Sequence, residues 1–222
     1  MSPPTATATH SRQGAGKQTA ASRHTVARRR RRRRLLILAA AAALALVAVV
    51  VGMPSVRKAV NDLSLPLSNQ DTIRQQAAAK HLDPALIAAV IYAETKFDPR
   101  PSSAGAEGLM QILPQTAEFL ARRSGATTFT TADLATPQVN IAYGSYYLRY
   151  LLDEYGGSTV LALAAYNGGE SNVSHWLAAA RSQGHRFTIA DISFPETHAY
   201  VLKVLRVQGE YRRSYATELG YR

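Results

Sequence analysis

Start and stop signals for helices recur along most of this chain, and they constrain its fold more than any other feature. Asp83 followed by Pro84 combines a capping residue with a proline at the first helical position, and the same order recurs at Thr136. Gly125 is typical of the residue just past a helix end. Alternation of apolar and polar residues, which is typical of strands, is nearly absent. Only residues 185–192 are compatible with an extended segment. The sequence therefore predicts a mainly α-helical domain of seven or eight helices.

Charge is distributed unevenly between the two ends of the chain. Residues 1–53 contain ten Lys or Arg and no Asp or Glu, whereas residues 54–222 contain sixteen basic and fifteen acidic residues. The predicted helical domain is therefore nearly neutral, which argues against nucleic-acid binding because that function needs a basic patch on the domain itself. Residues 1–27 are rich in small and polar residues and cannot bury enough apolar surface to fold. We predict a disordered basic tail over residues 1–34.

Seven consecutive arginines end at Arg34 and are followed by nineteen uncharged residues, 35–53. A helix of that length spans roughly the hydrocarbon core of a bilayer, and arginines stay on the cytoplasmic side. This pattern predicts a single-pass transmembrane signal anchor at residues 35–53, with a cytoplasmic amino terminus and the rest of the chain outside the membrane. The alternatives are a cleaved signal peptide, which has a shorter apolar region, and a buried helix beside a nucleic-acid-binding tail.

The remaining boundaries follow from composition. Residues 54–70 contain two prolines and little periodicity, so they indicate a linker; residues 71–215 form the predicted helical domain and residues 216–222 a C-terminal tail. The chain has no cysteine, which excludes disulfides, thiolate zinc sites and cysteine nucleophiles. The six histidines are scattered without metal-binding spacing, so we expect neither a metal nor a cofactor.

Glu94 is the first candidate for chemistry. It lies three residues after Ile91 and seven after Ile87, on or beside the apolar face of a predicted helix. A carboxyl group packed against apolar walls has a raised pKa and stays protonated near neutral pH, which is what a general acid for glycosidic bond cleavage requires. The alternative is an ordinary rim residue or a partner in an ion pair.

Two further segments contain polar side chains next to apolar ones. Met110 and Gln111 follow a glycine-containing loop, where Met110 offers a flexible apolar wall and Gln111 can both donate and accept. Tyr166 and Asn167 end an apolar helix. They are either an ordinary helix terminus or a pair in which Tyr166 bonds the acid and Asn167 holds a substrate amide or hydroxyl.

Five segments stand in an order that resembles a known family. They are Glu94-Thr95, "GAEGLMQILPQTA", "NIAYGSYYLRYLL", "ALAAYNGG" and "PETHAYVLKVL". Over about residues 70–215 the chain resembles lytic transglycosylases with the soluble lytic transglycosylase catalytic (SLT) domain, whose fold is similar to goose-type lysozyme. The resemblance implies a lysozyme-like helical domain.

The resemblance also implies roles for individual residues. It makes Glu94 the single catalytic acid and base. Thr95 stands where the family has a serine, and because a hydroxyl is retained we expect altered packing rather than lost activity. The residues expected to bind substrate are Thr95, Gly108, Leu109, Met110, Gln111, Tyr166, Asn167 and Tyr200.

The implied reaction is cleavage of the β-1,4 bond between N-acetylmuramic acid and N-acetylglucosamine in peptidoglycan, with formation of a 1,6-anhydro ring. The expected partners are peptidoglycan glycan strands and, through residues 35–53, the cytoplasmic membrane. The alternatives are a muramidase of the same fold, which is a hydrolase, and a non-catalytic peptidoglycan-binding module. Asp98 and Glu107 are nearby acids, but they are interpreted as a turn residue and a solvated residue rather than as a second catalytic acid.

Overall fold

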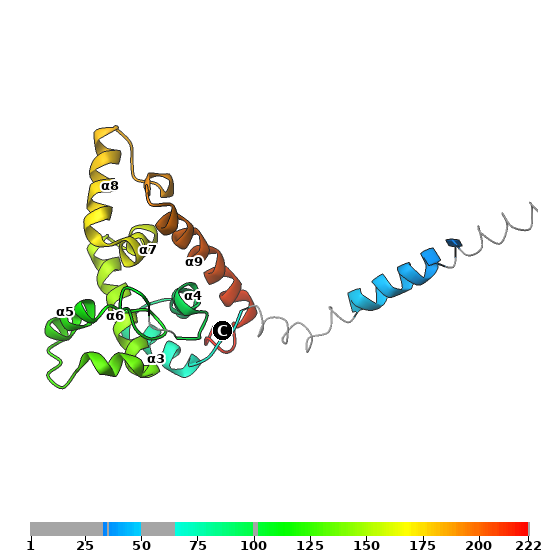
Figure 1. The fold of residues 1–222 in the computed structure, drawn as a ribbon, viewed down its shortest axis with the longest axis horizontal. Helices are drawn as coiled ribbons and strands as arrows, with labels where there is room; N and C mark the ends of the chain where they lie inside the picture. Colours follow the sequence, from blue (N-terminus) through cyan, green and yellow to red (C-terminus); the bar gives the residue numbers. More distant parts are fainter. Residues whose placement is uncertain (1–32, 35, 50–64, 100–101, 222) are drawn as a thin grey trace, which may run out of the picture. The chain divides into compact units, whose positions relative to one another are not determined.

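The computed structural model describes residues 33–34, 36–49, 65–99 and 102–221, which belong to two compact units, residues 1–59 and 60–222. In its described part the second unit contains seven α-helices and two 3-10 helices (Figure 1). They are α3 (Gln70–Lys80), α4 (Pro84–Thr95), α5 (Pro114–Ser124), η1 (Thr131–Ala135), α6 (Pro137–Glu154), α7 (Thr159–Gly168), α8 (Glu170–Ser182), η2 (Ile189–Asp191) and α9 (Pro195–Ser214). The predicted mainly α-helical domain is confirmed.

The predicted transmembrane anchor at residues 35–53 is wrong for the part of the chain that the structure describes. No helix within this part is long and apolar enough to span a bilayer. An uncharged run fixes the hydropathy of a segment, but it does not by itself fix where a helix begins and ends. Apart from residues 33–34 and 65–70, the predicted tail and linker lie outside the described residues.

Local chemistry explains where the helices of the second unit begin. The Asp83 carboxylate accepts a hydrogen bond from the Ala85 backbone N–H at 3.0 Å, so it caps α4 as predicted. The Ser158 hydroxyl accepts from the Leu161 N–H at 3.4 Å at the start of α7. The segment 185–192 contains the 3-10 helix η2 rather than a strand, and the Thr188 N–H donates to the Asp191 carboxylate at 2.7 Å.

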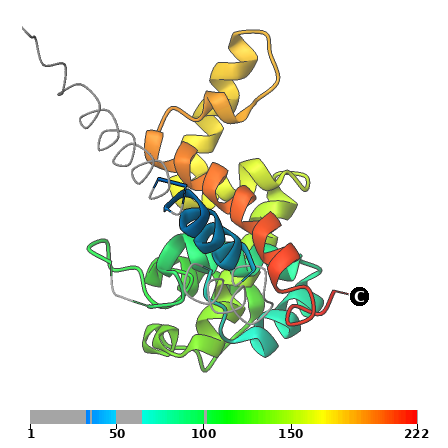
Figure 2. The ribbon, with the colours of Figure 1, turned by 90° about the vertical axis from the view of Figure 1, so that its right-hand side faces the viewer.

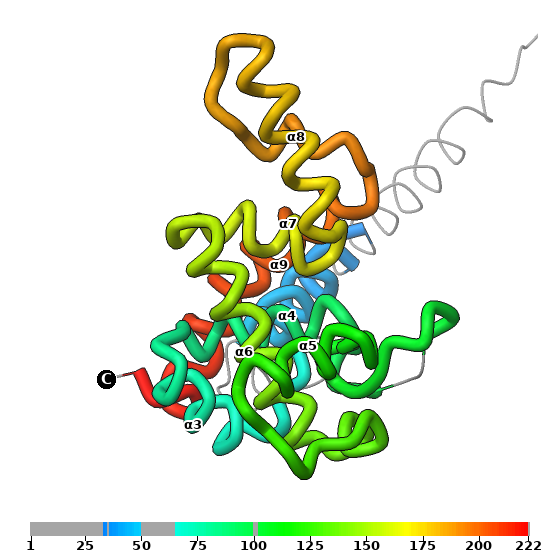
Figure 3. The backbone as a smooth tube through the Cα atoms, turned by 90° about the vertical axis from the view of Figure 1, so that its left-hand side faces the viewer, coloured from blue at the N-terminus to red at the C-terminus, as the bar shows by residue number. Residues whose placement is uncertain are grey.

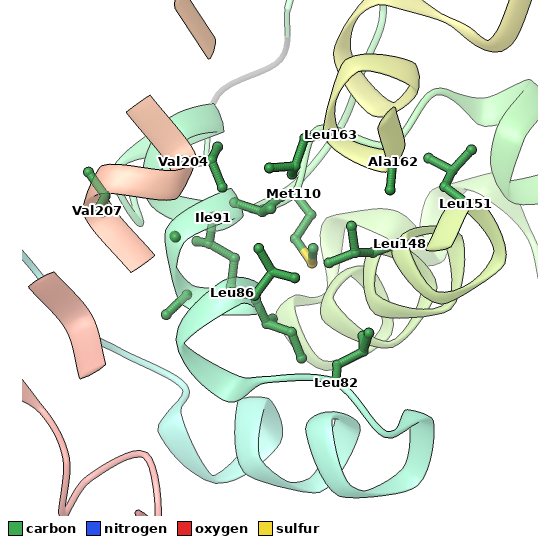
Figure 4. Packing of buried hydrophobic residues seen from close by; sticks show 14 of the residues in the cluster. Leu82, Leu86, Ile91, Met110, Leu148, Leu151, Ala162, Leu163, Val204 and Val207 are labelled. Carbon is green, nitrogen blue, oxygen red and sulfur yellow. The ribbon is translucent and has the colours of Figure 1, made fainter. Parts of the chain in front are cut away.

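Helix α4 lies in the core of the second unit. Every side chain from Ala85 to Ile91 is buried, as expected for a helix that is apolar on all sides. Figure 4 shows Met110 between Leu86 and Ile91 of α4 and Leu148 of α6. Because the buried part of α4 ends just before Glu94, the helix carries this acid from the core to the surface.

The C-terminal helices extend away from this core and then return to it. In Figures 2 and 3, α8 and the loop after it project away from α3, α5 and α6. Helix α9 then runs past α7 and packs along α4. This return brings residues that are more than 100 positions away in the sequence next to Glu94.

Candidate functional site

The last turn of α4 places Glu94 at the edge of a pocket. The next two residues after the helix, Lys96 and Phe97, have left-handed backbones with φ of 52° and 64°, so the chain turns sharply there. The pocket has a volume of about 460 Å³. It is lined by Ala93, Glu94, Thr95, Lys96, Asp98 and Gln111, and we call it the Glu94 pocket.

The environment of Glu94 favours its protonated form. Burial raises the pKa of Glu94 to about 7, while the hydroxyl of Tyr200 and the charge of Lys203 act in the opposite direction. Desolvation is the largest of these effects because a buried carboxylate loses its hydration. Tyr200 itself is buried, and its hydroxyl completes no hydrogen bond with the described residues, although it lies near enough to lower the pKa of Glu94. The site can therefore supply a proton near neutral pH.

Tyr166 lies close to the acid but does not hydrogen-bond to it. Its hydroxyl donates to the Met110 carbonyl at 2.8 Å. Burial, and then the negative charge of Glu94, raise the pKa of Tyr166, so this hydroxyl remains a donor at neutral pH. Tyr166 therefore stabilises the loop opposite the acid. This contact differs from the predicted hydrogen bond between Tyr166 and Glu94.

Asn140 holds the loop that faces Glu94, residues 107–111, against α6. The sequence did not indicate a role for Asn140. The buried Asn140 amide accepts from the Met110 N–H at 2.7 Å and donates to the carbonyls of Glu107, at 2.8 Å, and Leu134, at 3.1 Å. Gly108 has φ of 72°, and a Cβ on it would lie 2.1 Å from the Asn140 side-chain nitrogen. Only glycine fits this position, and the quoted segment "NIAYGSYYLRYLL" was the available signal for Asn140.

Two loop residues that were expected to bind substrate have buried side chains. Leu109 and Met110 are 2% and 0% exposed, so their side chains belong to the core and any contact with substrate would involve their backbones. Gly144 of α6 permits this packing, because a Cβ there would lie 2.4 Å from the Met110 sulfur. Gln111 does line the Glu94 pocket, and its side-chain nitrogen donates to the Gly108 carbonyl at 2.9 Å.

Thr95 ties the end of α4 to the same loop. Its hydroxyl lies 2.8 Å from the Leu109 carbonyl and 3.2 Å from the Ile91 carbonyl, both possible acceptors. A serine hydroxyl can make the same bond, so the threonine preserves the contact between the acid-bearing helix and the loop. Thr95 also lines the pocket. The contact between its hydroxyl and the Leu109 carbonyl positions the loop relative to α4.

Asn167 lies apart from the Glu94 pocket. It is exposed, and its side-chain oxygen accepts from the Thr197 hydroxyl at 2.8 Å. It lines a separate pocket of about 390 Å³ with residues at the start of α9. The structure thus brings Glu94, Thr95 and Gln111 into one pocket and sets Asn167 in another.

Three further charged residues lie near the site, and the sequence drew attention to only two of them. Asp98 lines the Glu94 pocket and is exposed. Glu107 is half-buried, and its backbone pairs with Ile112 at the far side of the loop. Lys203 was missed: it lies three residues after Tyr200 in "PETHAYVLKVL", and only the packing of α9 on α4 reveals it. Among the residues that the structure describes, no three His, Asp or Glu side chains gather as metal ligands would.

Comparison with known proteins gives consistent matches. Residues 71–188 match the family model described as the transglycosylase SLT domain. The soluble lytic murein transglycosylase of Escherichia coli K12 is 32% identical over 151 residues, which covers 66% of this chain and 23% of that protein. The membrane-bound lytic murein transglycosylase C of Actinobacillus pleuropneumoniae serotype 5b is 33% identical over 111 residues, covering 46% of this chain and 30% of that one.

A solved structure agrees with the fold. An inactive variant of the lytic transglycosylase Slt from Pseudomonas aeruginosa, in which glutamine replaces a glutamate, superposes with a TM-score of 0.64 at 32% identity. The match covers 70% of this chain and 26% of that one, so the chain spans about a quarter of the length of this protein and of the E. coli relative. The family model, the sequence relatives and the superposition agree that this chain belongs to the transglycosylase SLT domain family.

Proposed function

We propose that this chain is a peptidoglycan lytic transglycosylase in which Glu94 is the single acid and base. It cleaves the β-1,4 bond between N-acetylmuramic acid and N-acetylglucosamine. The observation that carries the proposal is the position of Glu94 in a pocket where burial raises its pKa to about 7. A carboxyl group with that pKa is a proton donor at neutral pH and a usable base after it has donated.

The reaction uses two proton transfers at Glu94, and the second one restores the protonated acid. Glu94 gives its proton to the bridging oxygen, the bond from the muramic acid C1 to that oxygen breaks, and N-acetylglucosamine leaves with a free 4-hydroxyl. The substrate N-acetyl group stabilises the cationic C1. The Glu94 carboxylate then removes the proton of the muramic acid 6-hydroxyl, whose oxygen bonds to C1 and closes the 1,6-anhydro ring. No water is consumed, so no second carboxylate is needed to activate one.

A relative supports the choice of a single glutamate. The P. aeruginosa structure is of an inactive protein that differs by a glutamate-to-glutamine replacement. In our proposal Glu94 has the corresponding importance, because glutamine cannot donate a carboxylic proton. Tyr200, Gln111 and Asn167 remain proposed substrate contacts, together with the backbone of the loop at Gly108–Met110.

A muramidase reaction is the second candidate, and Asp98 is the observation that favours it. Asp98 lines the same pocket as Glu94, and inverting glycosidases use a second carboxylate to activate water. A hydrolase of this kind would depend on both acids. A lytic transglycosylase would depend on Glu94 alone.

Digestion of purified sacculi with three proteins separates these candidates. We expect the wild-type protein and Asp98→Asn to release muropeptides one water lighter than the hydrolysed products, and Glu94→Gln to bind sacculi without releasing any. Products with free reducing ends that require Asp98 would establish the muramidase. Failure of the wild type to release any product, with binding intact, would establish a non-catalytic peptidoglycan-binding module.

The substrate also determines where the domain would act. Peptidoglycan lies outside the cytoplasmic membrane, so we propose that the second unit works on the cell-wall side. A related protein from A. pleuropneumoniae is described as membrane-bound. Protease accessibility of the second unit in intact spheroplasts tests this placement: external protease should degrade it, and full protection would contradict the proposal.

A further inference from the structure

Lys203 of α9 contacts the last turn of α4 directly beside Glu94. Its ammonium group donates to the Ala93 carbonyl at 2.9 Å and lies 5.6 Å from the centre of the Tyr92 ring. The Ala93 carbonyl is one of the last four of α4, which have no partner within the helix. Lys203 therefore supplies this end of α4 with a cap that comes from another helix.

This contact fixes the peptide group from which Glu94 continues. The Ala93 carbonyl belongs to the planar peptide group that runs from the Ala93 Cα to the Glu94 Cα, so a bond to its oxygen restrains the orientation of the whole group. Tyr200 precedes Lys203 by three residues, so both side chains lie on the same face of α9. One helix thus presents a hydroxyl and an ammonium group to the same carboxyl group.

The charges around Glu94 come from several elements. The titratable groups that face it or line its pocket are Tyr200 and Lys203 of α9, Tyr166 of α7, and Lys96 and Asp98 in the turn after α4. Burial lowers the pKa of Lys203, as do the charges of Lys96 and Arg206, whereas the charge of Glu94 raises it. The negative end of the α4 dipole disfavours an ionised Glu94, and the ammonium group of Lys203 opposes that effect.

We propose that Lys203 is a positioning residue that fixes Glu94 through Ala93 and stabilises its ionised form. The inference rests on the proposed function. In that reaction Glu94 is a carboxylate only between its two proton transfers, after the glycosidic bond has broken and before the 6-hydroxyl has given up its proton. Lys203 neither gives nor takes a proton; its fixed charge favours the carboxylate during that interval.

The test compares four variants by carboxyl ¹³C NMR titration of Glu94, with the resonance assigned from Glu94→Gln. Lys203→Met removes the charge and the bond, Lys203→Gln keeps a neutral donor, and Lys203→Arg keeps the charge. Arg206→Met is the matched control, because it removes an exposed charge from α9 that pairs with Glu210 instead. Loss of the Lys203 charge should raise the pKa of Glu94 by about 0.5 to 1 unit, whereas Lys203→Arg and Arg206→Met should leave it unchanged.

The same variants are then assayed on sacculi. Because Glu94 must begin protonated, activity falls as pH rises through its pKa, so Lys203→Met and Lys203→Gln should move this basic limb of kcat/KM to higher pH. Their kcat at the optimum should fall roughly tenfold, which is within the range of general acid–base effects. A purely structural role would lower kcat without moving the limb.

An unchanged Glu94 pKa in both neutral variants, or an equal rise in Arg206→Met, would overturn the inference. The NMR titration needs no substrate. If the Lys203 variants show the predicted pKa changes but the wild-type protein releases no anhydro products, the proposed function is contradicted and the role of Lys203 stands. Circular dichroism melting of each variant shows that the comparison is made on folded protein.

Discussion

At the scale of single residues, burial raises the pKa of Glu94 and also lowers the free energy of unfolding once the carboxyl group would be ionised. The helix carries the carboxyl group out of an apolar core, and desolvation raises its pKa to about 7. Between its unfolded pKa of 4.5 and about 7, the folded state holds a proton that the unfolded state has lost. The free energy of unfolding therefore falls as pH rises through this window, and the loss is complete above it.

Replacing Glu94 by Gln removes this cost, because glutamine is a neutral isostere of the protonated acid. We expect Glu94→Gln to be more stable than the wild type at pH 8 by roughly 1–3 kcal/mol, with the difference vanishing near pH 4. Urea denaturation at a series of pH values measures it. Equal stability at every pH would show that the pKa of Glu94 is not raised in the folded protein.

At the scale of elements, the site depends on how α6 holds the loop at residues 107–111. Asn140 makes three hydrogen bonds that connect this loop and η1 to α6. Tyr166 adds a fourth contact from α7 through the Met110 carbonyl. The loop is thus positioned by two helices, while α4 and α9 position the acid opposite it.

Truncation of Asn140 should disturb the loop and the stability together. We expect Asn140→Ala to cost about 2–4 kcal/mol, because it leaves a buried N–H without its acceptor and two carbonyls without their donor. The kcat on sacculi should fall as well. Gln138→Ala is the control, since Gln138 is exposed on the same helix two residues earlier. Similar melting temperatures for the two variants would contradict this account of the loop.

The sequence predicted those features that depend on neighbouring residues. Asp83 caps α4 as expected because its partner, Ala85, is two residues away. The exposure of Met110 could not be predicted, since it depends on how closely Gly144 lets α6 approach. Lys203 was missed for a related reason: its contact with Ala93 spans 110 positions. Sequence patterns therefore identified Glu94, its loop, Thr95 and Tyr166, but not Asn140 and Lys203, whose contacts also hold the acid and the loop in place.

At the scale of the whole second unit, the residues just before α3 contact the C-terminal end of α9 and the residue that follows it. The Tyr215 hydroxyl donates to the Leu65 carbonyl at 2.7 Å, and the Tyr211 hydroxyl donates to the Pro66 carbonyl at 2.5 Å. Leu219 is 2% exposed and belongs to the core. We propose that the predicted catalytic domain, residues 71–215, contains the site but needs both flanking segments for its full stability.

Two fragments test this proposal. Residues 60–222 should unfold in one cooperative transition, and residues 71–215 should melt at a clearly lower temperature because they lack the buried side chains of Leu65 and Leu219. Differential scanning calorimetry of both fragments provides the comparison. Equal melting temperatures would show that the flanking segments contribute little.

Digestion of sacculi in water enriched in ¹⁸O tests most directly the central claim that Glu94 performs both proton transfers without water. If the muramic acid 6-hydroxyl is the nucleophile, the wild-type protein should release 1,6-anhydro muropeptides that carry no ¹⁸O. Glu94→Gln should release none at detectable rates. Products that carry one ¹⁸O at a new reducing end would show that water attacks C1, and they would contradict the account.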